Sequence, residues 1–207
     1  MSSYKKGGQG ASAVIIKDTI NTIIKNIQEV AESIDEKTIK ELIEKLTSSA
    51  SIFVIGLGRS GLVAKAFAMR LMHLGMKVFV VGETITPAIK KKDCLIAISG
   101  SGETSYILKA ARIAKKRGSD VVAITSYPES SLSKIADLTV TIKGKTKIDG
   151  EQNYIKRQMK GNHHSKTPLG TLFEISALIF LDGLIAELME KLNKKEKDMM
   201  EMHNVFE

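Results

Sequence analysis

Apolar residues recur along the chain with two different spacings, and the change between them predicts the order of its elements. From Val14 to Ser33, isoleucines and other apolar residues lie three or four positions apart, which predicts an amphipathic helix. Asp35 is placed to cap a second helix that continues through Leu46. A pair of amphipathic helices ahead of the first strand is suited to covering a sheet or packing on a partner subunit.

Five short runs rich in Val and Ile follow, and most of them do not alternate with polar residues. These runs are 51–55, 77–81, 94–98, 121–125 and 138–142. Continuous apolar runs are expected for strands that are buried on both faces. Helical patterns lie between several of the runs, at 62–74, 104–117 and 131–137, and a long helix is expected from about Leu169 to Leu192. The alternation predicts an α/β fold with a parallel, doubly wound sheet and right-handed crossovers.

The amino-acid composition is that of an ordinary globular protein, and its variation along the chain indicates a short tail followed by one domain. The 207 residues are 43% hydrophobic and include one cysteine, which excludes a disulfide scaffold and a four-thiolate zinc site. We expect residues 1–13, rich in Gly, Ser and Lys, to form a flexible tail without a secretory signal, and residues 14–207 to form a single domain. The apolar stretch 172–189 contains three carboxylates, so we expect a buried helix and a cytoplasmic protein without a membrane segment.

The positive charge is concentrated in one segment. The chain has a formal net charge of +8, and residues 143–166 contain seven cations against two acids. Such a segment can attract nucleic acid, an acidic membrane or a phosphorylated metabolite, or can simply be a solvated loop. Aromatic residues make up only 5% of the chain, and base-stacking surfaces need aromatics beside the cations. We therefore expect a small phosphorylated ligand, and neither nucleic acid nor a membrane, as the partner.

The first glycine-rich turn directly follows the first predicted strand. Its sequence, Gly56-Leu57-Gly58-Arg59-Ser60-Gly61, matches the dinucleotide-binding fingerprint, and Glu83 lies where an acid for a ribose hydroxyl is expected. A lone fingerprint of this kind has low specificity. Arg59 can bind a ligand hydroxyl or phosphate through its planar guanidinium, or can hold the turn or a subunit contact through a salt bridge.

The second glycine-rich turn, Ser99-Gly100-Ser101-Gly102-Glu103-Thr104, follows the third predicted strand and also opens a helix. Its glycines allow the backbone to approach a ligand, and backbone N–H groups at a helix N-terminus attract an anion. The three hydroxyls of the turn suit the oxygens of a phosphate group. The alternative is a tight turn with Ser or Thr helix caps. Neither turn contains the lysine of a Walker motif.

A single carboxylate, Glu174, interrupts the apolar start of the last long helix. A buried carboxylate without a partner is costly, and such residues are candidates for general bases. Pro168 and Gly170 mark the helix entry, so Glu174 is expected near the first turn. The alternative is a capping box in which Thr171 is the N-cap and Glu174 the third helical residue.

The remaining histidines and the cysteine can be explained by structural roles as well as by functional ones. His73 lies at the end of a predicted helix, where it favours the helix dipole. His163 and His164 are adjacent and have no further ligands near them, so we expect no metal site. Cys94 begins a buried strand and is interpreted as a core residue.

The two turns together resemble a sugar isomerase (SIS) domain. Four stretches, at 58–61, 68–75, 81–84 with 86–87, and 167–174, resemble the 6-phospho-3-hexuloisomerases within that family, and the likeness extends over about residues 14–207. Ile85 and the last three residues, 205–207, depart from the commonest family forms. It implies a flavodoxin-like three-layer sandwich with five parallel strands. It also implies a homo-oligomer, usually a tetramer, with a dimer as the alternative. The implied reaction converts D-arabino-hex-3-ulose 6-phosphate to D-fructose 6-phosphate in the ribulose monophosphate pathway, without metal or cofactor.

The resemblance also implies roles for particular residues. Glu174 is the expected general base, and His73 a second acid/base or hydroxyl ligand. His73 or His203 can act across a subunit interface. The expected substrate-binding residues are Gly58, Arg59, Ser60, Ser99, Gly100, Ser101, Gly102, Glu103 and Thr104.

Three alternatives remain open on the sequence. A phosphosugar-binding SIS module without catalytic activity would keep both turns without needing Glu174. Another phosphosugar aldose/ketose isomerase would use the same residues on a different sugar. A dinucleotide-dependent oxidoreductase would use Gly56, Gly58, Gly61 and Glu83, but leaves the serine-rich turn unexplained.

Overall fold

A computed structural model describes residues 11–144 and 167–203 of the chain. It contains five strands: β1 (Ile52–Ile55), β2 (Val78–Val80), β3 (Cys94–Ile98), β4 (Asp120–Thr125) and β5 (Leu138–Thr141). They form one sheet in the order β2-β1-β3-β4-β5, and every neighbouring pair is parallel. The direction of chain progression across the sheet reverses between β1 and β3, which is where ligands bind in open α/β sheets.

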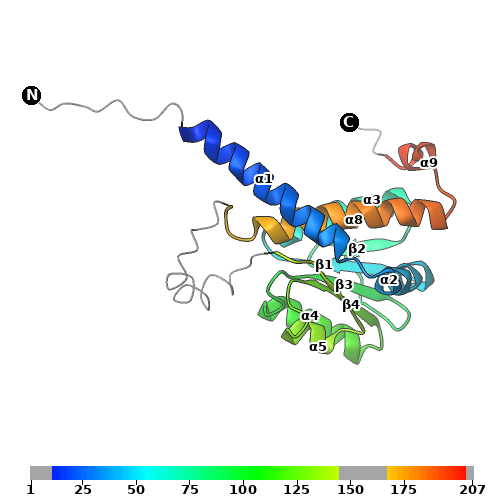
Figure 1. Ribbon diagram of the computed structural model, residues 1–207. Helices are drawn as coiled ribbons and strands as arrows, with labels where there is room; N and C mark the ends of the chain where they lie inside the picture. The colour runs from blue at the N-terminus through cyan, green and yellow to red at the C-terminus, as the bar shows by residue number, and fades with distance from the viewer. Residues whose placement is uncertain (1–10, 145–166, 204–207) are drawn as a thin grey trace, which may run out of the picture.

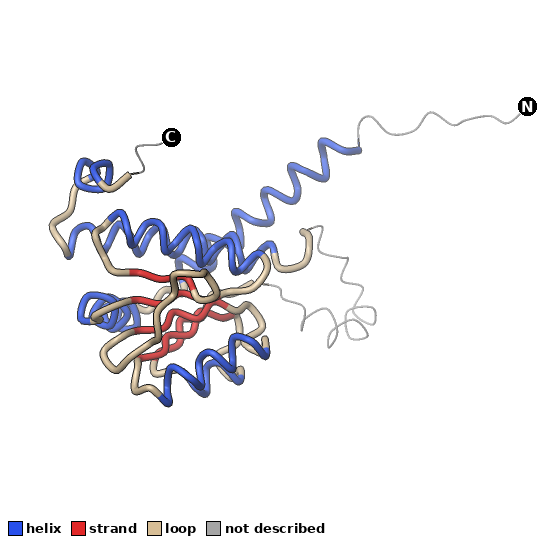
Figure 2. The backbone as a smooth tube through the Cα atoms, turned by 180° about the vertical axis from the view of Figure 1, so that it is seen from behind, coloured by secondary structure: helices blue, strands red, loops and turns tan. Residues whose placement is uncertain are grey.

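Helices cover both faces of this sheet. They are α1 (Ala11–Glu32), α2 (Glu36–Ser48), α3 (Arg59–His73), α4 (Ser105–Lys116), α5 (Ser131–Ile135), α8 (Thr171–Lys191) and α9 (Glu196–Glu201). Figures 1 and 2 show α3 and α8 on one side of the sheet, with α4 and α5 on the other. The expected flavodoxin-like three-layer sandwich with a five-stranded parallel sheet is confirmed.

Successive strand residues point to opposite faces and contribute to two separate apolar clusters. In β1, Ile52 and Val54 pack with α2, α3 and α8, whereas Phe53 and Ile55 pack with α4 and α5. All four residues are buried. Burial of both faces explains why the strand sequences are continuously apolar.

The second helix begins as the sequence predicts, because the Asp35 side chain accepts a hydrogen bond from the Thr38 backbone N–H at 2.9 Å. By contrast, α3 begins at Arg59, three residues before the predicted start. The N-cap of α3 is Gly58, whose positive φ of 57° is available at low cost to glycine alone. A side chain at Gly56 would collide with the Ser60 carbonyl, so this glycine brings the start of α3 against the end of β1.

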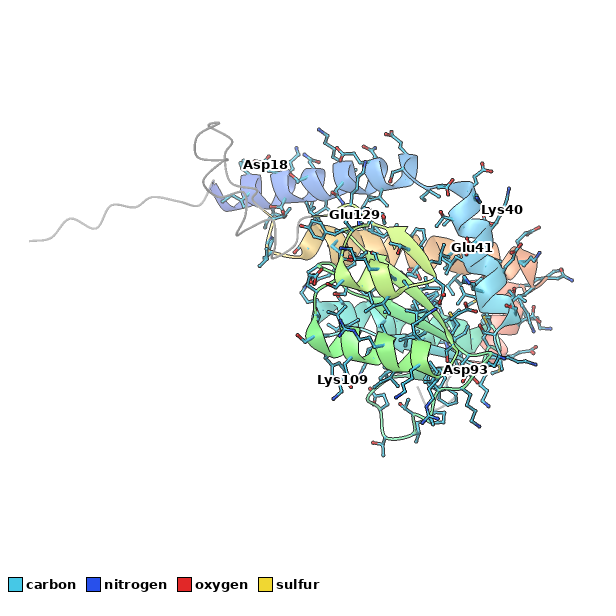
Figure 3. All side chains as sticks on the ribbon, turned by 90° about the horizontal axis from the view of Figure 1, so that it is seen from below. Asp18, Lys40, Glu41, Asp93, Lys109 and Glu129 are labelled. Atoms are coloured by element: carbon cyan, nitrogen blue, oxygen red, sulfur yellow. The ribbon has the colours of Figure 1, made fainter. Side chains whose placement is uncertain are left out.

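Helix α1 extends past the edge of the sheet in all three views, and Figure 3 labels Asp18 on its projecting part. Its apolar residues Val14, Ile16, Ile20 and Ile24 are about half exposed. In the described part of the chain, no helix is long and apolar enough to cross a membrane.

Several sequence-based expectations fall outside the described residues. They concern most of the N-terminal tail (1–10), most of the basic segment (145–166, including His163 and His164) and the last four residues (204–207).

Candidate active site

A cavity of about 480 Å³ lies at the carboxyl ends of β1 and β3, where the strand order reverses. It is lined by residues 57–60, by residues 98–101 with Thr104 and Ile107, and by Leu169, Gly170, Phe173 and Glu174. Its volume suits a small metabolite. The residues of both glycine-rich turns and the isolated carboxylate therefore come together in one place.

The N-termini of three helices converge on this cavity. Helix α3 begins at Arg59, α4 at Ser105 and α8 at Thr171, and residues at all three starts line the cavity. The first N–H groups of a helix have no partner within the helix, and the aligned peptide dipoles add a partial positive charge there. Three such ends make the cavity suited to an anionic ligand.

The hydroxyls of the serine-rich turn lie at the start of α4. Ser99 Oγ lies 3.3 Å from Thr104 Oγ1 and accepts a hydrogen bond from the Gly102 N–H at 3.2 Å. Ser101 Oγ accepts from the Glu103 N–H at 3.2 Å. Both serines thus act as acceptors to the backbone; the Ser101 O–H remains a donor, and within the Ser99–Thr104 pair one hydroxyl donates to the other. The Thr104 side chain makes no hydrogen bond that caps α4, although Thr104 is its N-cap residue.

Two residues of this turn do not line the cavity. Gly102 has a φ of +65°, and a side chain there would collide with Ser130, so this position shapes the turn. The Glu103 carboxylate accepts a hydrogen bond from the Ser131 N–H at 2.7 Å, at the start of α5. Backbone and side-chain hydrogen bonds from Ser131 lower the pKa of Glu103. These contacts hold Glu103 against α5.

Glu174 lies in the first turn of α8 and forms an ion pair with Arg59. Arg59 donates through Nε to Oε2 of the carboxylate. The Glu174 side chain is only 14% exposed, whereas the Arg59 side chain is 58% exposed. The pair joins the start of α3 to the start of α8 across 115 positions of sequence.

The capping-box interpretation of Glu174 is wrong. The N-cap of α8 is Gly170, with φ +85° and ψ −20°, and no side chain caps this helix end. The Glu174 backbone N–H bonds to the Gly170 carbonyl at 3.0 Å, in ordinary helical fashion. Glu174 is instead turned toward Arg59 and the cavity.

His73 lies at the other end of α3 from the cavity. Fourteen positions separate it from Arg59, which corresponds to about 21 Å of helix rise. The side chain is buried, and its ring centroid lies 5.2 Å from that of His203. Burial first, and then the charges of His203 and Arg70, lower the pKa of His73. Within one chain, the structure does not bring His73 and Glu174 together.

Two other sequence candidates lie outside the cavity. Glu83 pairs with Lys65 at 2.6 Å and does not line the cavity. Cys94 is completely buried in β3, and desolvation raises the pKa of its thiol to about 12. Among the described residues, no group of three or more His, Cys, Asp or Glu is arranged to hold a metal ion.

Sequence reasoning missed the apolar wall and the Arg59–Glu174 pairing. Leu57, Ile107, Leu169 and Phe173 contribute to the cavity wall. The Pro168-Leu169-Gly170 helix entry was visible as a turn signal, but its proximity to the glycine-rich turns was not.

An α/β sheet with hydroxyl-rich and glycine-rich turns at its switch point, opposite one carboxylate, defines a class of proteins that bind small anionic metabolites. The SIS domain family model matches residues 45–157, more than half of the chain. The chain belongs to the SIS domain family.

Similar proteins cover most of the chain. The 3-hexulose-6-phosphate isomerase of Bacillus subtilis is 39% identical over 181 residues, which is 87% of this chain and 93% of that protein. The 3-hexulose-6-phosphate isomerase of Methanocaldococcus jannaschii is 41% identical over 162 residues, covering 78% and 80% of the two chains. A Methanococcus jannaschii crystal structure from which that same function was inferred is 37% identical and superposes with a TM-score of 0.73, covering 92% and 98%.

Proposed function

We propose that this chain, as a single SIS domain over residues 14–207, is a sugar-phosphate isomerase that interconverts D-arabino-hex-3-ulose 6-phosphate and D-fructose 6-phosphate. The observation that carries the proposal is the placement of one carboxylate, Glu174, in the cavity that the hydroxyl-rich turn also lines. The similarity to proteins named 3-hexulose-6-phosphate isomerase supports this sugar over other phosphosugars.

The phosphate of the sugar binds at the start of α4. Ser99, Ser101 and Thr104 donate their hydroxyl hydrogens to its oxygens, and the N-termini of α3 and α4 add N–H donors. Ser60, with Gly58 and Gly100, lines the adjoining wall. Because the phosphate is remote from the reacting carbons, its binding energy serves to hold the sugar in place.

Glu174 transfers the proton between the two carbons. Its carboxylate takes the proton from C2 of the 3-keto sugar, which gives a cis-enediolate with the negative charge on O3. The hydroxyl proton of O2 then passes to O3, and Glu174 returns its proton to C3 to leave the 2-keto sugar. The C3 keto group cannot close a five- or six-membered ring because O6 carries the phosphate, so no ring-opening catalyst is needed in the direction that starts from the 3-keto sugar. A positioned base of this kind contributes a factor of ~10²–10⁴.

Arg59 has two tasks in this scheme. Its Nε holds the Glu174 carboxylate, while the rest of the half-exposed guanidinium remains available to the sugar oxygens. As negative charge develops on those oxygens in the enediolate, the adjacent cation stabilises it.

His73 requires a second subunit if it is to act at the cavity, since it lies at the far end of α3 in its own chain. A homo-oligomer, a tetramer with a dimer as the alternative, is supported by the exposed apolar side of α1. The groove of about 340 Å³ between α1 and α8, with the exposed Ile179 on its wall, continues this apolar surface. An interface in which two copies pack this same surface together would bury the exposed apolar side chains of both α1 and α8.

Light scattering coupled to size-exclusion chromatography tests the assembly. The wild-type chain should elute as a tetramer or dimer, and Ile16→Lys with Ile20→Lys should lower the mass. A monomeric wild type would remove the proposed interface and any role for His73 at the cavity.

An isomerisation assay tests the function itself. The chain is mixed with D-arabino-hex-3-ulose 6-phosphate, and the formation of D-fructose 6-phosphate is followed, with the Glu174→Gln variant as the control. Ligand-induced thermal stabilisation without turnover would instead indicate a non-catalytic phosphosugar-binding module. Turnover of a different phosphosugar alone would keep the class of reaction and change the substrate.

A further inference from the structure

The N-cap residue of α8 lies directly beneath the proposed catalytic carboxylate. A Cβ atom added to Gly170 would lie 2.9 Å from Oε1 of Glu174, 3.3 Å from Cδ and 3.4 Å from Oε2. All three atoms of the carboxylate group therefore lie over the Gly170 Cα. The space that a side chain at this position would take is filled by the carboxylate itself.

The carboxylate is also held by Arg59. Its Nε donates to Oε2, whereas the oxygen nearest the Cβ position of Gly170 is Oε1, so the carboxylate contacts both the guanidinium and the bare Gly170 backbone. The backbone of Gly170 is left-handed, with φ +85°, and its carbonyl accepts the Glu174 N–H. Gly170 thus affects Glu174 through the absence of a side chain as well as through its backbone conformation.

The first turns of α8 are fixed from other directions. Phe173 is buried in the core, and the loop after β5 lies so close that a Cβ on Gly144 would be 2.5 Å from the Phe173 backbone nitrogen. Asn26 on α1 donates to the Ser176 hydroxyl at 2.9 Å and to the Lys143 carbonyl at 3.0 Å. Because the helix is held in this way, a side chain at position 170 is accommodated by movement of the flexible Glu174 carboxylate.

We infer that Gly170 is a positioning residue for the reaction: it leaves the space in which the Glu174 carboxylate rests against Arg59 and faces the sugar. This inference rests on the proposed isomerase function. Added side-chain volume at position 170 displaces the base from the reacting carbons, while the phosphate contacts at the start of α4 remain intact.

The chain offers a matched control for the backbone strain. Gly118, at the end of α4, has a φ of +79°, and a Cβ there meets only the flexible Lys91 side chain at 3.6 Å or more. Gly170→Ala and Gly118→Ala therefore place alanine at nearly the same unfavourable positive φ, +85° and +79°. The two variants differ in that the methyl group at position 170 meets Glu174.

The test compares kinetics and melting temperatures of both variants with the wild type. Both should melt at similarly reduced temperatures. Gly170→Ala should lower kcat about 10- to 100-fold, because a misplacement of about 1 Å costs a factor near 10². Its KM should stay within about threefold of the wild-type KM, because the phosphate turn is unchanged. Gly118→Ala should keep the wild-type kcat.

Introducing Gly170→Ala into the Glu174→Asp variant separates an effect on the position of the carboxylate from a general effect on the structure. In Glu174→Asp the carboxylate is one methylene shorter and no longer reaches the added methyl group. Gly170→Ala should then change the residual kcat by less than about threefold. An equal loss in both backgrounds, or a wild-type kcat in Gly170→Ala, would overturn the positioning role.

Two further outcomes are covered by the same design. If Gly170→Ala does not fold, Gly170→Asn and Gly118→Asn replace the pair, because asparagine adopts left-handed conformations more readily and still carries a Cβ. If the wild type itself does not isomerise the sugar phosphate, the proposed function fails and the inference fails with it. An active wild type with an unaffected Gly170→Ala variant contradicts the inference alone.

Discussion

Replacing Glu174 with glutamine separates a catalytic base from a carboxylate that only stabilises the fold. The substitution keeps the size of the side chain and one oxygen that can accept from Arg59, but it removes the ability to take a proton. A general base contributes ~10²–10⁴ to the rate, so kcat should fall by that factor. This loss corresponds to about 2.7–5.4 kcal/mol of transition-state stabilisation.

The effect of the same change on stability should be much smaller. Arg59 is 58% exposed, and ion pairs with an exposed partner contribute about 0–1 kcal/mol. A carboxylate in the first turn of a helix adds about 0.3–1 kcal/mol through the dipole. The expected loss is therefore at most about 2 kcal/mol, and a domain of this size melts about 2–4 °C lower per kcal/mol.

The assay measures kcat by the formation of fructose 6-phosphate and stability by thermal denaturation. Glu190→Gln is the matched control, because it makes the same chemical change near the far, exposed end of α8. Glu174→Gln should still bind the sugar phosphate, because the hydroxyl turn is intact. A variant that melts at a lower temperature but keeps near-normal turnover would refute the role of Glu174 as base.

Three further predictions test other parts of the account. Thr104→Val removes one donor to the phosphate, and a hydrogen bond to a charged group is worth about 1.5–3 kcal/mol. KM should therefore rise about 10- to 150-fold with little change in kcat, and an unchanged KM would mean that the phosphate binds elsewhere. The Cys94 thiol, with its pKa raised to about 12 by burial, should react with thiol reagents at neutral pH only after unfolding, and rapid labelling of the native chain would contradict this burial. Burial and nearby cations lower the pKa of His73 below 6.5, so the folded chain favours the neutral imidazole. The resulting gain in the free energy of unfolding is present above about pH 6.5 and is lost as the pH falls through the folded-state pKa. His73→Gln should therefore show a smaller drop in melting temperature between pH 7 and pH 5, and a drop equal to that of the wild type would assign the loss to other groups.

The sheet and its turns could be predicted because their signals are local. The β3 run at Cys94–Ile98 is reproduced at both ends, since burial on both faces demands an unbroken apolar sequence. The start of α3 was placed too late, because Gly58 and Gly61 favour a turn, whereas here Gly58 caps the helix and Gly61 lies in its first turn. Helix α9 was not predicted, because its polar sequence leaves no buried residue and gives no apolar stripe.

The sequence identified most residues of the candidate site, but it did not show which of them contact one another. The pairing of Glu174 with Arg59 joins residues 115 positions apart, and only the tertiary fold decides that α8 begins beside α3. The position of His73 could have been inferred from topology alone. A crossover helix between parallel strands runs from their carboxyl ends back to their amino ends, so a residue in its last turn lies away from the ligand edge.

A crystal structure of the complex with D-fructose 6-phosphate would show the phosphate site and the reacting carbons in one experiment. We expect the phosphate within hydrogen-bond distance of Ser99, Ser101 and Thr104, and the Glu174 carboxylate about 3–3.5 Å from C2 and C3 of the sugar. A phosphate bound away from the α4 turn, or a Glu174 carboxylate facing away from those two carbons, would contradict this expectation.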